Sequence, residues 1–247
     1  MNNEKRYEFF KEKHIHTLDG KPLTGVTTVL GVIAKPALIQ WAANMAVEYI
    51  LNNAIVGAST EADTVIVLKT TIEKAKTAHR IKKEKAGDWG TLVHAWVEKY
   101  AMSKILEQSE PVILEGKMGE ACSHFKKWSE DNKVKFLESE KNVWSEKLWI
   151  GGIADLLVEI DGQKWVADIK TGSGIYPEHF AQMSAYQLCM EEMGMYEGVV
   201  GHIVLNLKKD GSFDERRSVS NEDSRQFFLS ALSIYRSQEK LKNQVIQ

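Results

Sequence analysis

A two-residue Asp-Gly turn, Asp161-Gly162, set between two apolar runs, constrains the fold of this chain more than any other feature. Asp-Gly is a strong signal for a tight β-hairpin, so Ile160 should pair with Gln163. Counting outward from that pair places Asp155 opposite Asp168, with their Cβ atoms about 5 Å apart. Two facing carboxylates destabilise a sheet unless a cation lies between them or one of them is protonated. A divalent metal is the simpler of these two resolutions.

Side-chain alternation gives the predicted hairpin one face that carries charges and one that is apolar. Lys170 shares the first face with Asp155 and Asp168, so two carboxylates and an ammonium converge there. The second face is apolar except for Gln163 at the turn, and it can pack on a core. Its apolar residues are Leu156, Val158, Ile160, Trp165, Ala167 and Ile169.

The composition indicates a globular protein with a substantial core. With 247 residues and 43% hydrophobic content, we expect one compact domain over 1–247, mostly helical over 36–131 and sheet-bearing over 134–207. No stretch approaches the about 20 apolar residues of a membrane span, and the polar start lacks the centre of a signal peptide, so we expect a cytoplasmic protein. Two cysteines, Cys122 and Cys189, are too few for a disulfide framework, a four-cysteine zinc site or an all-cysteine iron-sulfur cluster.

Periodicity predicts the order of the elements. Helices are expected from Pro36 to about 52, over 60–86, from an N-cap at Asp88 to about 105, over 117–131, from Pro177 to about 193 and over 221–242. A short hairpin around Asp19-Gly20 followed by the strand-like, β-branched run Val26–Val29 is expected near the start, and strands dominate 134–170 and 198–207.

Three further groups of residues have both a functional and a structural interpretation. On a helix, His94 and Glu98 share a face, so His94 is either a metal ligand with a carboxylate neighbour or a structural histidine. Gln182 and Tyr186 are one turn apart, and they either orient Lys170 or hold a phosphate, or they are ordinary helix-surface polarity with a half-buried ring. The basic segment 72–86, which includes Lys82 and Lys83, is either a nucleic-acid surface or a solvated helix face.

Taken together, four motifs resemble the RecB-type branch of the PD-(D/E)xK nuclease superfamily. They are Gly90-x-x-x-His94, Gly152-x-x-Asp155, Asp168-Ile169-Lys170-Thr171-Gly172 and Gln182-x-x-x-Tyr186, in matching order and spacing. The segment from Thr24 to Trp41 also resembles the start of phage-encoded members. The chain has Ala154 where the family has a proline before the first aspartate, a common departure in this branch.

The resemblance implies a restriction-endonuclease-like α/β fold, with a central mixed sheet flanked by helices and a helical N-terminal half. It implies DNA as substrate and Mg²⁺ or Mn²⁺ as cofactor. Carried over to this chain, it implies that His94, Asp155, Asp168 and the backbone carbonyl of Ile169 hold the metal, while Lys170 positions or activates the attacking water. Glu98, Thr171, Gln182, Tyr186, Lys82 and Lys83 are the expected supporting or DNA-binding residues.

The leading expectation is therefore a metal-dependent DNA exonuclease of phage or bacterial recombination and repair, acting on DNA and with a possible recombination partner protein. An endonuclease or nickase would use the same site. A non-catalytic DNA-binding or assembly protein of the same fold is the alternative from another class. Intact Asp155, Asp168 and Lys170 argue against it, because without a bound metal the facing carboxylates would only destabilise the sheet.

Overall fold

The computed structural model describes residues 6–53, 61–219 and 221–244, with side chains except at 36–37, 61–68 and 83–86. Contacts along the backbone divide the chain into two compact units. The larger unit joins 1–33 to 92–247, and the smaller unit is 34–91. That both units act as one nuclease domain stays a prediction.

The strands all belong to the larger unit. They are β1 (Tyr7–Phe10), β2 (Ile15–Leu18), β3 (Lys21–Pro22), β4 (Thr24–Gly25), β5 (Lys135–Ser145), β6 (Ile150–Ile160), β7 (Gln163–Lys170), β8 (Val199–Leu207) and β9 (Phe213–Ser218). The helices are α1 (Val26–Leu30), α2 (Pro36–Asn53), α3 (Glu61–Ile105), α4 (Gly116–Asp131), α5 (Pro177–Glu192) and α6 (Asn221–Gln244). None of the helices in the described ranges is long and apolar enough to cross a membrane.

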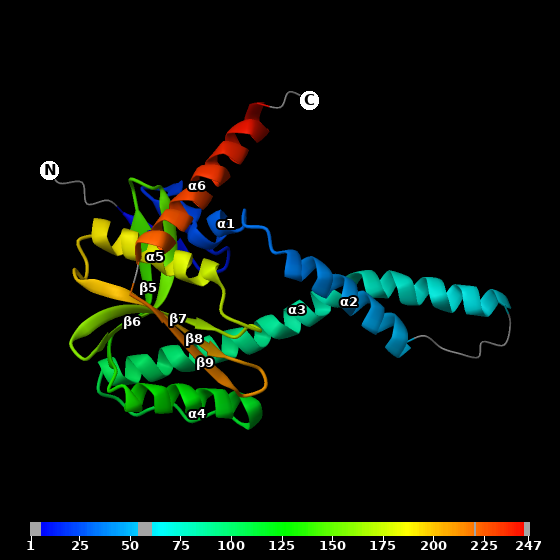
Figure 1. Cartoon of the computed structure of the whole chain (residues 1–247), viewed down its shortest axis with the longest axis horizontal. Helices are drawn as coiled ribbons and strands as arrows, with labels where there is room; N and C mark the ends of the chain where they lie inside the picture. Colours follow the sequence, from blue (N-terminus) through cyan, green and yellow to red (C-terminus); the bar gives the residue numbers. More distant parts are fainter. Residues whose placement is uncertain (1–5, 54–60, 220, 245–247) are drawn as a thin grey trace. The chain divides into compact units, whose positions relative to one another are not determined.

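A six-stranded mixed sheet forms the centre of the larger unit (Figure 1). Along one path the strand order is β4-β6-β7-β8-β9, and β5 pairs with β6. The pairs β5–β6, β6–β7 and β8–β9 are antiparallel, whereas β4–β6 and β7–β8 are parallel. The expected fold class, a central mixed sheet flanked by helices, is confirmed.

The β6–β7 hairpin has the predicted register. Asp161 and Gly162 both have positive φ, 51° and 75°, as the tightest hairpin turns require. The ladder runs from Ile160–Gln163 to Leu156–Ala167. The next pair outward would be Asp155 with Asp168, so both aspartates lie just past the end of this ladder.

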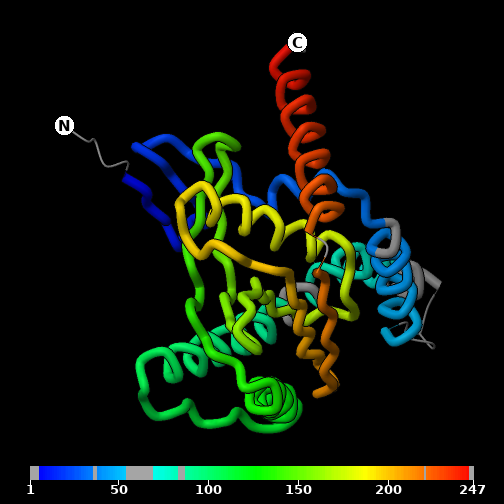
Figure 2. Tube along the Cα trace, turned by 60° about the vertical axis from the view of Figure 1, so that its left-hand side comes forward, coloured from blue at the N-terminus to red at the C-terminus, as the bar shows by residue number. Residues whose placement is uncertain are grey.

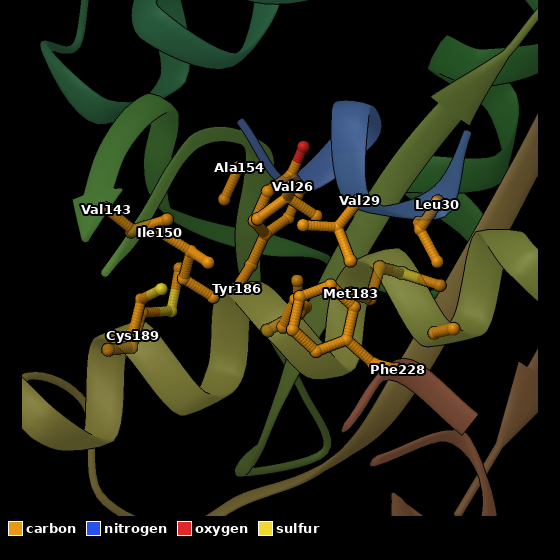
Figure 3. Close-up of a cluster of buried hydrophobic side chains, with 14 of the residues drawn as sticks. Val26, Val29, Leu30, Val143, Ile150, Ala154, Met183, Tyr186, Cys189 and Phe228 are labelled. Carbon is orange, nitrogen blue, oxygen red and sulfur yellow. The ribbon is translucent and has the colours of Figure 1, made fainter. Parts of the chain in front are cut away.

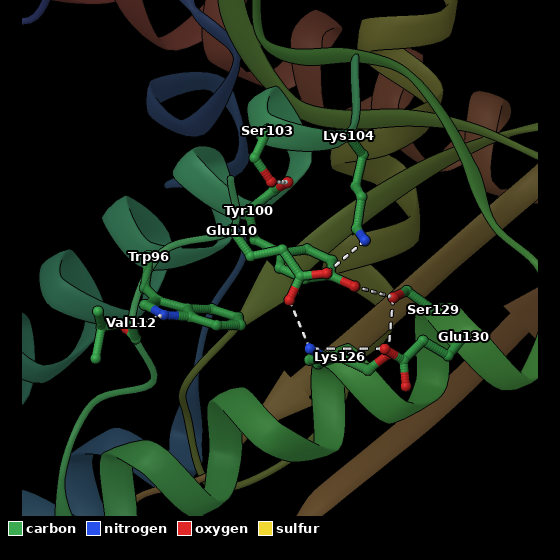
Figure 4. A network of polar contacts seen from close by, with 9 residues as sticks. All are labelled: Trp96, Tyr100, Ser103, Lys104, Glu110, Val112, Lys126, Ser129 and Glu130. Carbon is green, nitrogen blue, oxygen red and sulfur yellow. Dashed lines mark hydrogen bonds and ion pairs between the residues drawn. The ribbon is translucent and has the colours of Figure 1, made fainter. Parts of the chain in front are cut away.

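Helices cover both faces of the sheet, so the hairpin is buried on each side. On one face α1, α5 and α6 contribute Val29, Met183 and Phe228 to a buried apolar cluster (Figure 3). Leu157 and Val166 of the hairpin belong to the same cluster. On the other face, Val158 pairs with Phe136, which contacts Tyr100 of α3 (labelled in Figure 4) and Phe125 of α4. The six apolar residues predicted for this second face are all 5% exposed or less.

Strands β1 to β3 form a separate small sheet against the ends of β5 and β6 (Figure 2). The Tyr7 ring stacks on Trp144, with centroids 4.4 Å apart, and the Tyr7 hydroxyl donates to Asn142 at 3.2 Å. The predicted turn at Asp19-Gly20 lies between β2 and β3. The strand β1 before it was not predicted.

Two predicted elements are wrong. The β-branched run after Gly25 is the helix α1, because Val26, Val29 and Leu30 repeat at the three- and four-residue spacing of a helix and are all buried. Asp88 does not begin a helix: α3 continues through it to Ile105. The strong helix formers before Gly87 offset the about 1 kcal/mol that a glycine costs inside a helix.

Candidate active site

Asp155 lies where β6 changes its pairing partner. β6 pairs with β4 at Ile150 and Gly151 and with β7 from Leu156 onward, so Asp155 falls in the gap between the two ladders. Instead of pairing across the sheet, its side chain turns to β7. Its Oδ2 accepts a hydrogen bond from the backbone N–H of Ile169 at 2.8 Å, which holds the carboxylate beside the end of the hairpin.

Asp168 is a buried carboxylate with one cationic partner. It is 1% exposed, and the Lys170 ammonium lies 2.6 Å from its Oδ2. Its Oδ1 is also buried and has no hydrogen-bond partner in the part of the chain that the structure describes. Burial raises the pKa of Asp168, and the neighbouring Lys170 opposes that rise. Burial would lower the pKa of Lys170, but the charges of Asp168 and Asp155 outweigh it and raise that pKa.

A chain of hydrogen bonds ties Lys170 to α5. Its Nζ donates to Gln182 Oε1 at 3.1 Å, and Gln182 Nε2 donates to the Tyr186 hydroxyl at 2.7 Å. Tyr186 is 4% exposed, and burial raises its pKa well above the ordinary value, so its hydroxyl stays neutral. The two α5 residues are therefore joined to Lys170 and are not ordinary surface polarity. Thr171, which follows Lys170, is half-buried.

The ring of Tyr186 fits against Gly152 of β6. A Cβ atom at this glycine would lie 2.5 Å from Cε1 of the ring, far inside van der Waals contact. The glycine in Gly152-x-x-Asp155 thus allows α5 to approach the strand that carries Asp155. This contact places Tyr186 in the core cluster labelled in Figure 3.

His94 approaches the carboxylates from α3. Its Nδ1 lies 3.6 Å from Asp155 Oδ2, and its side chain is 34% exposed. Glu98, one turn further along α3, is exposed. His94 therefore lies beside Asp155, and its role as a metal ligand stays a prediction.

Glu140 of β5 is a site residue that the sequence did not reveal. One ligand atom from each of His94, Glu140 and Asp155 lies within 4.8 Å of the others. Burial, followed by the charges of Asp155 and Glu98, raises the pKa of Glu140 to about 7. No motif marks this glutamate, because it belongs to a strand with several charged residues, and only the pairing of β5 with β6 brings it here.

The predicted DNA-binding lysines belong to the smaller unit. Lys82 is exposed and lies 3.6 Å from Glu48 of α2. The side chain of Lys83 lies outside the described residues. Lys82 therefore has an ion-pair partner, and its contact with DNA stays a prediction.

The donors at this site fit a divalent cation. Mg²⁺ prefers carboxylate and carbonyl oxygens, and an imidazole makes Mn²⁺ equally suitable. The unpartnered Oδ1 of Asp168 is the observation that tests this fit, because a buried carboxylate oxygen without a donor is costly and a metal ion would satisfy it. Asp155 and His94, whose Oδ2 and Nδ1 lie 3.6 Å apart, offer further ligand atoms.

Comparisons with known proteins agree with this site. A model of the PD-(D/E)XK nuclease superfamily matches residues 69–245, which is more than half of the chain. This protein belongs to the PD-(D/E)XK nuclease superfamily. The match includes His94, Asp155, Asp168 and Lys170, and the superfamily indicates a metal-dependent nuclease.

The other comparisons add little. None of the curated proteins matches this chain. A solved structure described as "Crystal structure of SSO0001" aligns with 46% of this chain and 56% of its own, with 14% sequence identity and a TM-score of 0.27. The chain thus spans just over half the length of that protein, and the likeness is too weak to carry an argument.

Proposed function

We propose that this protein is a Mg²⁺- or Mn²⁺-dependent DNA exonuclease of phage or bacterial recombination and repair, acting in the cytoplasm. The observation that carries the proposal is the pair of aspartates at the end of the β6–β7 ladder, with Lys170 2.6 Å from Asp168. Superfamily membership supports hydrolysis of phosphodiester bonds. A recombination partner protein is part of the same proposal.

Asp155, Asp168, the carbonyl oxygen of Ile169 and His94 are the proposed metal ligands. A divalent cation bound there would stabilise charge on the phosphate oxygens and lower the pKa of a bound water. The hydrogen bond from Ile169 N–H to Asp155 fixes one carboxylate, and burial fixes the other. Both ligands are therefore held in place before any substrate binds.

Lys170 is proposed to position the attacking water or a phosphate oxygen. Its raised pKa keeps the ammonium charged, so it acts as a hydrogen-bond donor at neutral pH. Gln182 Oε1 accepts a hydrogen bond from the Lys170 ammonium and holds it toward Asp168. Tyr186 orients Gln182 in turn, and Thr171 and Glu98 are the proposed flanking contacts.

The deciding experiment compares end-labelled linear DNA with closed circular DNA in Mg²⁺, Mn²⁺ or EDTA. Wild type should degrade only linear DNA, and only with metal. The near-isosteric Asp168→Asn should be inactive, while Asp161→Asn, which keeps a residue suited to the positive φ of the turn, should retain activity.

The other outcomes select between the alternatives. Metal-dependent cutting of circles would replace the exonuclease with an endonuclease or nickase at the same site. Inert wild type that still binds DNA would identify a non-catalytic DNA-binding or assembly protein. Degradation that persists in EDTA at the full rate would overturn the metal-dependent proposal.

A further inference from the structure

Three carboxylates lie in register on three neighbouring strands. β5 pairs with β6 through Ser139–Leu156 and Lys141–Ala154, which places Glu140 opposite Asp155. On the other edge of β6 the hairpin register places Asp168 next to Asp155. The row Glu140–Asp155–Asp168 therefore crosses three strands, and neighbouring strands in a sheet lie about 4.8 Å apart.

Among the described side chains, only the Asp168 end of this row has a lysine or arginine within ion-pair distance. Lys170 pairs with Asp168, and Lys141 of β5 turns to Glu138 at 2.9 Å. Asp155 and Glu140 face each other on neighbouring strands, and His94 of α3 lies close to both. Like charges directly opposite each other in a sheet are destabilising. Among the described side chains, the charge of Lys11 opposes the rise in the pKa of Glu140 but does not cancel it, so a further cation at this pair would be stabilising.

The backbone holds Glu140 in an uncommon conformation. Its φ is 48°, in the left-handed region that few residues other than glycine adopt. Glu140 and Asp155 do not pair in the ladder, although the residues on either side of them do. The strand is thus locally distorted where its carboxylate approaches His94 and Asp155.

A second observation points independently to a cation. The Asp168 side chain is almost fully buried, and its Oδ1 lacks a hydrogen-bond partner among the described residues. Oxygens bound to one Mg²⁺ lie up to about 4.2 Å apart, since each bond is about 2.1 Å. The 4.8 Å limit for His94, Glu140 and Asp155 is close to that value, so a small side-chain movement would complete the coordination.

We propose that Glu140 is a direct ligand of the divalent cation at this centre, together with His94 and Asp155. This inference rests on the proposed function, because it assumes that the centre binds metal. It goes beyond the superfamily motifs, none of which contains Glu140. The ligand class is a hard divalent cation, Mg²⁺ or Mn²⁺, since a third carboxylate favours such ions.

The proposal is tested by titrating chelator-stripped protein with Mn²⁺. The paramagnetic resonance signal of free Mn²⁺ measures how much of the ion is bound. Replacing a residue that only supports a metal ligand already lowers metal affinity by about 10–100-fold. Glu140→Gln should therefore weaken Mn²⁺ binding at least about tenfold. Glu159→Gln, a half-exposed glutamate on β6 whose partner is Lys135, should bind Mn²⁺ like wild type.

The thermal stability of the metal-free protein gives a readout that does not depend on activity. As a metal ligand, Glu140 adds repulsion toward Asp155 in the metal-free state, and Lys11 offsets that repulsion only in part. Glu140→Gln should therefore melt at the same temperature or higher, and Mn²⁺ should raise its melting temperature less than that of wild type. If Glu140 instead serves as an ion-pair partner of His94, the variant should melt lower without metal, and its Mn²⁺ affinity should be unchanged. That result would overturn the proposal.

Asp155→Asn separates this inference from the proposed function. If Asp155→Asn weakens Mn²⁺ binding while Glu140→Gln does not, the metal centre stands and the role of Glu140 is refuted. If wild type binds no Mn²⁺ at all, both the proposed function and this inference fail.

Discussion

At the scale of single residues, the Asp168–Lys170 pair of the proposed active site should also contribute to the folding stability of the protein. Replacing Lys170 by Met leaves a buried carboxylate without its cation, and breaking a buried pair in this way costs about 3–5 kcal/mol. Denaturant unfolding in EDTA at pH 8 should show a loss approaching this size. At pH 5 the loss should be smaller, because burial raises the pKa of Asp168 and the carboxyl can take up a proton.

The double variant Asp168→Asn/Lys170→Met isolates the interaction. It should be more stable than Lys170→Met alone, since the uncompensated charge is gone. Lys164→Met, whose ammonium donates to the backbone of Glu197 at the surface, is the matched control and should change stability little. A loss below about 1 kcal/mol for Lys170→Met would show that Asp168 does not need its partner.

Gly152 offers a prediction about positioning. In Gly152→Ala the added methyl would lie 2.5 Å from the Tyr186 ring, so α5 must shift and carry Gln182 with it. Overpacking of this kind costs about 1–3 kcal/mol. Because displacing a positioning group by about 1 Å can cost roughly 100-fold, DNA cleavage should fall by a comparable factor. Gly172→Ala, where a Cβ meets nothing within 4 Å, is the control. Equal cleavage rates for the two variants would contradict this role of Gly152.

Most of the charged centre was predictable at this scale. The Asp161-Gly162 turn fixes the register by counting, so Asp155, Asp168 and Lys170 follow from the sequence. Glu140 does not, because its position depends on how β5 pairs with β6 through a local distortion that no turn signal marks. The hydrogen bond from Ile169 N–H to Asp155 could not be predicted from the hairpin register either, since it forms where the ladder ends.

At the scale of elements, periodicity succeeded where one face of an element is buried. The bounds of α2, α4, α5 and β8 match the prediction closely. β9 was not predicted because its sequence is mostly charged, which suits the exposed edge of the sheet but carries no apolar alternation. The prediction for α1 was wrong because β-branched residues favour strands. The helical spacing of its buried residues, Val26, Val29 and Leu30, is visible only in the structure.

Variants in the basic part of α3 can distinguish a DNA-binding surface from a solvated helix face. Lys74 and Arg80 are exposed on this helix, and their neighbour Lys76 pairs with Glu73. If the segment contacts DNA, Lys74→Gln/Arg80→Gln should weaken binding and reduce the slope of log affinity against log salt by about 2. Fluorescence anisotropy over a salt series measures this. Lys127→Gln/Lys240→Gln, exposed on α4 and α6, is the control, and identical slopes for both pairs would favour the solvated face.

At the scale of the whole molecule, acid stability should depend on His202. This side chain is fully buried on β8, and its Nε2–H donates to Gln187 Oε1 at 3.0 Å. Its Nδ1 has no partner among the described residues, so a second proton would be buried without an acceptor. Burial, together with the charge of Arg225, lowers the pKa of His202 to about 4.

The sign of the effect follows from proton binding in the two states. Well above pH 6.5 the histidine is neutral whether the protein is folded or not, so it adds no pH dependence there. Between pH 6.5 and 4 the unfolded chain takes up a proton that the folded protein refuses, and the free energy of unfolding falls by up to about 1.4 kcal/mol per pH unit. His16, whose pKa is also lowered to about 4, adds a similar slope, which His202→Gln leaves in place. Denaturant unfolding at pH 6.5 and 4.5 should therefore show wild type losing about 2–3 kcal/mol more than His202→Gln. Equal losses would mean that His202 takes up its proton within the fold, and that the larger unit loosens around α5 before it unfolds.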